Sequence, residues 1–226
     1  MIRLTKELPD CSDIISAEQI KIYSTFDNYS DIALFWVQND NDCVISMLDN
    51  NMVILNNSAD IDELSEFIKM ICPSSIFSDF KTLELIGLKY IKKVSVYSAF
   101  KDCFDKENIK GDSLKSKEIY DIFKSSGLTL PEYEYFAVDY CLRLNHKKAE
   151  YFGIKDTCAA VSFSFGDKFI LNGIASTKKG YGSVALSGIL RKNAGKRAIV
   201  CCEDSVKEFY EKNGFEFMYK AGIWMC

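Results

Sequence analysis

The sequence predicts an α/β protein, and three observations lead to this prediction. Apolar residues recur with a period of two in some segments and at helical spacing in others, and the two kinds of segment alternate along the chain. Short glycine-containing segments separate them, as at Gly166-Asp167 and Gly180-Tyr181-Gly182. Hydrophobic residues make up 48% of the 226 residues, with only 3 Pro and 12 Gly, which excludes collagen-like and disordered chains.

In the N-terminal half, strands are expected at residues 32–37, 43–48 and 52–55, where β-branched and aromatic residues gather. Further strands are expected at 75–77 and near 94–97. Between them a helix is expected, because apolar residues recur at helical spacing: Ile61, Leu64, Phe67 and Ile68.

The stretch from Phe100 to Leu114 is the most polar of the chain. At roughly 150 residues per domain, the chain has the length of about one and a half domains. We therefore place a boundary near Gly111, between an N-terminal accessory domain of residues 1–112 and a second domain of residues 113–226.

The second domain begins with two helices. One is expected at 116–125, before Gly127, and the other follows Pro131. The period then changes to two, which predicts a strand from Ala149 and another up to the Gly166-Asp167 turn, where a glycine suits a type II′ hairpin. The chain returns through Phe169-Ile170-Leu171 and continues as a strand to Ala175.

The segment 176–183 opens a further helix that stops near Gly195, with an apolar face of Ala185, Leu186, Ile189 and Leu190. A buried strand is expected at 198–202. Ser205 to Glu208 has the pattern of a capping box, and the helix that follows would bury Val206, Phe209 and Tyr210 before Asn213-Gly214 ends it. A last strand runs from Phe215 to Met225.

The two halves resemble each other in order and in a few residues. Residues 34–37 resemble 151–154, residues 43–46 resemble 158–162, and residues 54–56 resemble 170–172. These likenesses indicate a diverged internal repeat. Where the second half has its glycines, the first has Asn57-Ser58-Ala59-Asp60, so a copy of the fold there would have lost an anion-binding turn.

Charge and composition restrict the partners. The net charge of −4 provides no broad positive field, so no nucleic-acid partner is expected. No run approaches the roughly 18 apolar residues of a membrane helix, and residues 1–10 lack a signal-peptide stretch, so we expect a cytoplasmic protein without a membrane partner. The 9 cysteines show no C-x-x-C and accompany a single His, so we expect reduced, mostly buried thiols and no metal site.

The strand-to-helix turn Lys178-Lys179-Gly180-Tyr181-Gly182-Ser183 has the chemistry of an anion site. Backbone amides at a helix N-terminus lack intrahelical partners, glycine lets the backbone approach a phosphate oxygen, and the two lysines add positive charge. A phosphate or pyrophosphate is the expected ligand. A turn that merely needs a positive φ, with solvated lysines, is the alternative.

The same residues also read as G-x-G-x-x-A, the phosphate-binding pattern of dinucleotide folds, with Gly180, Gly182 and Ala185. A strand that ends in Glu203-Asp204 follows at roughly the ribose-binding distance. A dinucleotide domain needs several more βα units after this point, and a lone match of this kind is weak.

The next residues separate the two readings. Phe209-Tyr210-Glu211-Lys212-Asn213-Gly214-Phe215, preceded by a glycine-initiated helix and a strand, resembles the end of a GNAT-superfamily N-acetyltransferase domain. The order of elements from Ser116 to Cys226 resembles that family as well. The resemblance implies a GNAT-like acyl-CoA N-acyltransferase fold, with a mixed, mostly antiparallel central sheet flanked by helices. The N-terminal half would then be a degenerate, partial ββαβ copy of it.

The resemblance further implies acetyl-CoA as cosubstrate, in a cleft between the fourth and fifth strands of the domain. The pyrophosphate would meet the amides of 178–183, and the pantetheine would pair like a strand with 174–176. Tyr210 would face the thioester sulfur, and because a phenol can protonate the departing thiolate, it is the candidate general acid. The implied cofactor-binding residues are Ile174, Ala175, Ser176, Lys178, Lys179, Gly180, Tyr181, Gly182 and Ser183.

The chain departs from the family pattern in two places. Thr177 stands where members usually carry Arg or Gln, in a loop that looks shortened, and this puts cofactor affinity in doubt. Glu203 and Val206 stand where Asn and Ala are frequent before the Phe-Tyr pair.

No general base is evident in the sequence. His146 is better explained as a residue at a helix end, and the acidic candidates are Glu150, Glu203 and Asp204. Cys201 and Cys202 lie in an expected buried strand and are therefore interpreted as inert thiols.

The function that these features favour is acetyl transfer from acetyl-CoA to a primary amine of a small molecule or peptide. The alternatives are a non-catalytic acetyl-CoA sensor or interaction module and, behind it, a dinucleotide-binding protein. The aromatic residues expected near an acceptor site are not diagnostic of its substrate: Tyr133, Tyr140, Tyr219 and Trp224. A monomer and a homodimer are both compatible with the sequence.

Overall fold

A computed structural model describes residues 1–226 apart from residue 12 and residues 40–41 and 101–108. The chain divides into two compact units. Unit 1 consists of Met1–Ser98 together with Cys201–Cys226, and unit 2 consists of Ala99–Val200. Within the described residues, no helix is long and apolar enough to cross a membrane.

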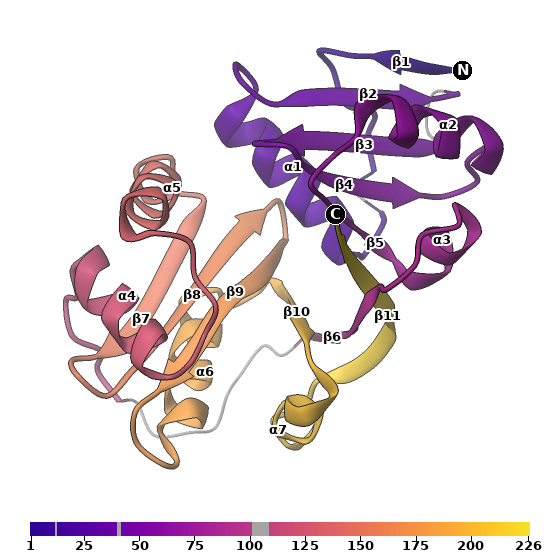
Figure 1. Ribbon diagram of the computed structural model, residues 1–226. Helices are drawn as coiled ribbons and strands as arrows, with labels where there is room; N and C mark the ends of the chain where they lie inside the picture. The colour runs from indigo at the N-terminus through magenta and orange to yellow at the C-terminus, as the bar shows by residue number, and fades with distance from the viewer. Residues whose placement is uncertain (12, 40–41, 101–108) are drawn as a thin grey trace. The chain divides into compact units, whose positions relative to one another are not determined.

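Unit 1 holds one sheet with helices on both faces (Figure 1). Its elements from the N-terminal part of the chain are β1 (Ile2–Leu4), α1 (Ala17–Tyr29), β2 (Leu34–Gln38), β3 (Cys43–Leu48), β4 (Asn51–Asn56), α2 (Ile61–Ile71), β5 (Ser75–Asp79), α3 (Phe80–Leu85) and β6 (Lys92–Ala99). Its C-terminal elements are the 3₁₀ turn η1 (Asp204–Val206), α7 (Lys207–Lys212) and β11 (Glu216–Met225). The strand order is β1-β2-β3-β4-β5-β11-β6.

The C-terminal strand completes the sheet of unit 1. β11 lies between β5 and β6 and is antiparallel to both, with Ile223 opposite Phe77 on one side and Lys92 on the other. The compact units therefore do not follow the order of the chain, because residues 201–226 pack with 1–98. The two compact units differ from the two domains predicted from the sequence, which meet between residues 112 and 113. The predicted domains are defined by sequence likeness, and that division stays a prediction.

Strand alternation sorts the side chains of unit 1 into two layers of core. On one face, α2 and α3 cover a cluster that includes Trp36, Ile45 and Ile54. On the other face lies α1, where Phe26 makes an edge-to-face contact with Phe35 at 5.2 Å between ring centroids. Because Phe35 and Trp36 are neighbours on β2, the two helical layers cover opposite faces of the sheet.

Unit 2 repeats this arrangement on a smaller scale. Its elements are α4 (Ser116–Ser125), α5 (Tyr133–Asn145), β7 (Ala149–Ile154), β8 (Cys158–Phe165), β9 (Lys168–Ser176), α6 (Tyr181–Lys192) and β10 (Arg197–Cys202), whose last two residues fall in unit 1. The strand order is β10-β9-β8-β7. Neighbours β7, β8 and β9 are antiparallel, and β9 and β10 are parallel.

Close contacts between glycines and aromatic rings hold the helices of unit 2 on its sheet. A Cβ on Gly188 of α6 would lie 2.2 Å from Cγ of Phe152 on β7, so only glycine lets this helix approach the strand. On the other face, Phe123 of α4 packs against Gly173 of β9. Phe152 and Tyr151 point to opposite faces, and Tyr151 meets Tyr140 of α5. Helices α4 and α5 therefore lie opposite α6.

The expected strands and helices agree with the structure wherever the sequence pattern was strongly periodic. The prediction of a capping box at Ser205 is wrong, because neither η1 nor α7 has a side-chain cap. Val206 was expected to be buried and is 44% exposed, since it lies in the 3₁₀ turn before α7. The sequence patterns also gave no indication of β1, α1 or α3. Cys103 and most of the polar stretch 100–114 lie outside the described residues.

Candidate functional site

The glycine turn of unit 2 leads directly into α6. Gly180 is the N-cap residue, with φ +88°, a left-handed conformation that favours glycine. No side chain caps this helix and its first turn carries no acidic residue. Lys178, Lys179, Gly180 and Tyr181 are all exposed. The turn thus presents backbone amides and two ammonium groups at the positive end of a helix, which is the chemistry expected for a phosphate site.

The strand before this turn, β9, extends beyond its parallel pairing with β10. β9 pairs with β10 only from Lys168↔Arg197 to Leu171↔Val200, and then continues to Ser176. The register with β8 shifts between Val161 and Ser162, so Asn172 is an extra residue in β9 at the point where the pairing with β10 ends. Residues 174–176 therefore belong to the part of β9 beyond the parallel pairing, where an extended ligand could add along the strand.

Thr177 fastens the end of β9 to the preceding hairpin. Its amide donates to the carbonyl oxygen of Thr157 at 2.8 Å, and its hydroxyl donates to that of Asp156 at 3.0 Å. These bonds hold the start of the turn against the β7–β8 hairpin.

Tyr210, the candidate general acid, lies on α7 in unit 1. Its ring is buried between Phe209 and Phe215, with centroid distances of 5.1 Å and 5.5 Å. Burial raises the pKa of Tyr210, so its hydroxyl keeps its proton at neutral pH. The predicted cofactor-binding residues thus belong to unit 2, and Tyr210 belongs to unit 1.

The base candidates named from the sequence lie in solvated settings. His146 is exposed at the C-cap of α5, and Glu150 faces Lys192 at 3.9 Å. Glu203 pairs with Lys92 at 2.6 Å. The Lys220 ammonium and the Ser95 hydroxyl, each 2.7 Å from Oδ1 of Asp204, hold the pKa of that carboxyl below its ordinary value. A lowered pKa makes Asp204 a weaker base.

The cysteines take part in no disulfide within the part of the chain that the structure describes. Cys11, Cys43, Cys158 and Cys202 are buried and Cys201 is partly buried, whereas Cys72, Cys141 and Cys226 are exposed. Burial raises the pKa of Cys201 to about 12 and that of Cys202 to about 11, which favours inert thiols. Among the described residues, no three His, Cys, Asp or Glu side chains gather closely enough to hold a metal ion.

Unit 1 contains the same strand plan as unit 2. Strands β2, β3 and β4 are antiparallel neighbours, α2 follows, and β5 then pairs in parallel with β4. This matches β7, β8, β9, α6 and β10 in order and direction. The predicted repeat is therefore present as topology, with α2 in the place of α6.

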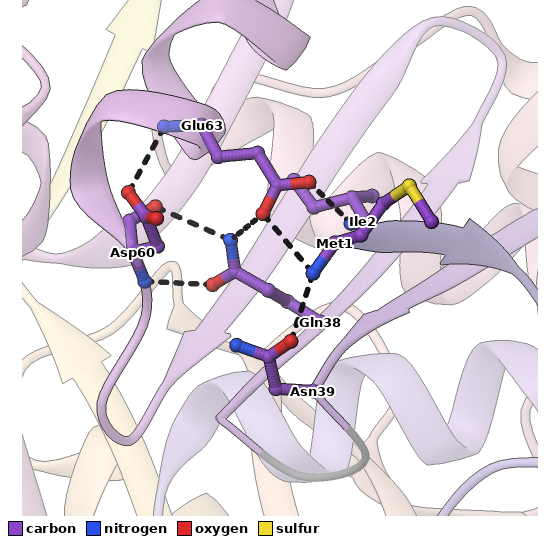
Figure 2. Close-up of polar contacts among 6 residues, drawn as sticks. All are labelled: Met1, Ile2, Gln38, Asn39, Asp60 and Glu63. Atoms are coloured by element: carbon purple, nitrogen blue, oxygen red, sulfur yellow. Dashed lines mark hydrogen bonds and ion pairs between the residues drawn. The ribbon is translucent and has the colours of Figure 1, made fainter.

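The turn at α2 is closed by carboxylates of the chain itself (Figure 2). Asp60 is the N-cap residue, and its Oδ1 accepts from the amide of Glu63 at 3.2 Å. The amide side chain of Gln38 bridges the two: its Oε1 accepts from Asp60 N at 2.8 Å and its Nε2 donates to Glu63 Oε2 at 2.6 Å. Glu63 Oε1 also accepts from the amide of Ile2. Negative charge thus occupies the helix end that in α6 carries none.

In unit 1, side chains also form hydrogen bonds beyond the point where the parallel pairing of β4 and β5 ends. The last parallel pair is Val53↔Phe77. Beyond it, the Ser78 hydroxyl donates to the carbonyl oxygen of Ile54 at 2.9 Å, and the Asn56 amide donates to the Thr82 hydroxyl at 2.7 Å. The carbonyl oxygen of Ile54, a backbone group of β4, is therefore already occupied by a hydroxyl of the chain itself.

The sequence patterns did not predict one buried polar pair in unit 1. Glu18 of α1 is only 2% exposed, and its Oε2 accepts a hydrogen bond from the hydroxyl of Tyr219 on β11. The same hydroxyl accepts from the amide of Ala17 at 3.0 Å. Tyr219 is one of the aromatic residues that the sequence places near an expected acceptor site. The pattern Ser16-x-x-Gln19, with the Ser16 hydroxyl accepting from the Gln19 amide, is a helix-start signal that would have placed Glu18 in a helix.

The comparison of the fold with solved structures gives similar chains at low sequence identity. A GCN5-related N-acetyltransferase from Sphaerobacter thermophilus has a TM-score of 0.56 at 8% identity, over 99% of this chain and 94% of its own. A tandem GNAT protein from the clavulanic acid biosynthesis pathway has a TM-score of 0.56 at 8% identity, over 98% and 90%. A functionally unknown conserved protein from Staphylococcus epidermidis has a TM-score of 0.53 at 11% identity, over 83% and 91%.

No family model and no curated protein matches the sequence. The likeness is thus one of fold, and it extends over nearly the whole chain and both of its repeated strand plans. The expected mixed α/β architecture, with an N-terminal ββαβ part built on the same plan, is confirmed. The chain has the fold of the GNAT N-acetyltransferases.

Proposed function

We propose that this protein transfers an acetyl group from acetyl-CoA to a primary amine. One observation supports the proposal most strongly. Helix α6 begins at a glycine turn that no side chain caps, and this turn directly follows β9, which extends beyond its parallel pairing with β10. A helix end of this kind favours a pyrophosphate, and a strand edge favours an extended amide chain such as pantetheine. CoA carries both groups.

The proposed cofactor residues divide into two sets. The amides and ammonium groups of Lys178, Lys179, Gly180, Tyr181, Gly182 and Ser183 would hold the pyrophosphate. The backbone of Ile174, Ala175 and Ser176 would pair with the pantetheine. Acetyl-CoA supplies the activated acyl group, and the reaction needs no metal.

Tyr210 would stabilise the departing thiolate. Its raised pKa keeps the phenol protonated, which is the form that can donate to sulfur. A thiol has an ordinary pKa of about 8.5, far below that of a buried phenol, so we expect the hydrogen bond from Tyr210 to the developing thiolate to provide most of the effect. Tyr210→Phe should lower kcat about 10²-fold and leave acetyl-CoA affinity within about twofold of wild type.

The proposed acceptor is a small molecule or peptide with a primary amine, and its identity is open. We further propose that the N-terminal half is a degenerate copy of the fold that binds no acetyl-CoA, because Asp60 and Glu63 occupy the α2 end. Titration calorimetry should then give one acetyl-CoA per chain. Two bound equivalents would contradict the degenerate copy.

A non-catalytic acetyl-CoA sensor is the second candidate, favoured by Thr177 in the place of a longer side chain. Calorimetry with acetyl-CoA, CoA and NAD separates the classes of ligand. Thiol release from acetyl-CoA with spermidine, tyramine and a lysine peptide separates an enzyme from a sensor. Binding without thiol release would favour the sensor, and tighter binding of NAD than of CoA would exclude both.

A further inference from the structure

Two exposed cysteines lie at the same end of the sheet of unit 1. Cys72 is the C-cap residue of α2, and Cys226 directly follows β11. Both are exposed, although cysteine is among the residue types that folded proteins bury most often. Among the described residues, the third exposed cysteine is Cys141, which lies on α5 in unit 2. The two thiols of unit 1 are therefore accessible to an oxidant.

The backbone of Cys72 is unusual for a cysteine. Its φ of 52° is in the left-handed region, where helix ends usually place glycine or asparagine because a Cβ is disfavoured. The thiol donates a hydrogen bond to the carbonyl oxygen of Lys69 at 2.9 Å, so the reduced form is accommodated at the helix end. Since glycine would adopt this conformation without strain, a cysteine here points to a use of the thiol itself.

The pairing of β5 with β11 brings Cys226 next to the segment that follows Cys72. The last pair of the ladder is Met225↔Ser75. One further bond follows, from the amide of Cys226 to the carbonyl oxygen of Ser74 at 3.0 Å. Cys226 is thus opposite Ser74, and Cys72 is two residues before Ser74. In Figure 1 the end of the chain, marked C, lies where β5 begins.

Both cysteines lie on the side of the sheet that α2 covers. Trp224 packs against the core cluster beneath α2, to which its β5 partner Ile76 belongs. Side chains alternate along a strand, so Cys226 and Ser74 point to the same face as Trp224. Cys72 ends the helix on that face. A diagonal neighbour across an antiparallel pair is about 7–8 Å away, and a disulfide needs Cα atoms about 4.4–6.8 Å apart. A small movement at the strand end therefore brings the two sulfurs together.

We propose that Cys72 and Cys226 form a reversible disulfide when the protein meets hydrogen peroxide, which makes this end of unit 1 a redox-sensitive switch. One sulfur attacks the peroxide, the O–O bond breaks, and the products are a sulfenic acid and water. The second sulfur attacks the first, so the S–S bond forms and the S–O bond breaks, with the oxygen leaving as a second water. The two thiol protons end in these waters, and the two electrons lost by sulfur reduce the peroxide.

The disulfide would join the end of α2 to the end of β11, the strand that follows α7 and completes the sheet of unit 1. A crosslink between residues far apart in the sequence restricts the unfolded chain, so the oxidised protein should be more stable than the reduced one. We expect oxidation to raise Tm by about 5–10 °C. The inference does not depend on the proposed acetyl transfer, because neither cysteine belongs to the proposed site.

The test uses the full chain, which is reduced, freed of reductant and treated with hydrogen peroxide. Trypsin releases each cysteine as the only one in its peptide, in residues 70–81 and 221–226. We expect mass spectrometry of the unreduced digest to find these peptides linked, and dithiothreitol to separate them. Cys72→Ser and Cys226→Ser should each abolish the link and the rise in Tm. Cys141→Ser, which removes an exposed thiol outside the pair, should behave as wild type.

Other products of oxidation would overturn the proposal. These are a disulfide that joins either cysteine to a different one, a dimer held together by a disulfide on a non-reducing gel, and sulfinic acid at Cys72 without a link. Two peptides that stay unlinked and unoxidised would overturn it as well. A linked protein with the Tm of the reduced form would show that the disulfide does not stabilise unit 1, which would refute the switch. None of these measurements uses acetyl-CoA, so the result leaves the proposed transfer to its own test.

Discussion

Replacing Gly180 by alanine tests the glycine turn against a matched control within the same unit. Gly180 has φ +88° and Gly195, after the end of α6, has φ +79°. A Cβ at either position would meet nothing within 4 Å. The two substitutions therefore impose the same kind of backbone strain without a steric clash, and only Gly180 lies in the turn proposed to hold the pyrophosphate.

The expected magnitudes follow from this geometry. An alanine in the left-handed region costs about 1–2 kcal/mol, and the loss of backbone freedom in the unfolded chain returns about 0.4–1 kcal/mol. Each variant should thus lose about 0.5–1 kcal/mol of unfolding free energy, a fall in Tm of roughly 1–4 °C. For Gly180→Ala, one lost charge-assisted hydrogen bond to phosphate, about 1.5–3 kcal/mol, would weaken acetyl-CoA binding about 10–100-fold.

Both effects can be measured in wild type, Gly180→Ala and Gly195→Ala. Calorimetry gives the affinity for acetyl-CoA, and thermal unfolding gives Tm. Similar Tm values for the two variants, with weaker binding in Gly180→Ala alone, would support the proposed site. Equal affinity in all three proteins would refute the assignment of the turn, and equal weakening in both variants would assign the loss to strain elsewhere in α6.

Two further predictions concern packing and charge. Gly188→Ala should lower the unfolding free energy by about 1–3 kcal/mol, because its Cβ would lie 2.2 Å from the Phe152 ring, and Phe152→Leu should recover part of this loss in a double-mutant cycle of chemical denaturation. For Asp204, whose folded-state pKa is lowered by Lys220 and Ser95, the stability advantage of wild type over Asp204→Asn should be present at pH 7 and disappear as pH falls below about 4. A difference in stability that does not change with pH would contradict the second prediction.

Elements with a strong local signal could be predicted from the sequence, and α1 shows why others could not. The helix buries Glu18, Gln19 and Ser24 as well as Ile20 and Ile22, so its apolar residues do not form a clean face. A periodicity argument depends on such a face. The helix α3 has only six residues, too few to show a period.

The same distinction applies to the candidate site. The glycine turn is local, since the conformation of Gly180 and the start of α6 depend on adjacent residues, and the sequence predicted it. The partner of Tyr219 is 201 residues away in the chain. No spacing rule connects such residues, because their contact exists only after β11 has entered the sheet of unit 1.

The position of β11 gives the N-terminal half a role even if it binds no acetyl-CoA. β11 pairs on both sides with strands of that half, and the segment just before it carries α7 with Tyr210. Because a strand without neighbours loses its backbone hydrogen bonds, β11 depends on β5 and β6 for its place. Without them, α7 would lose the strand that follows it in the same unit. A copy that had lost its phosphate turn would therefore still be retained, because residues 201–226 fold against it.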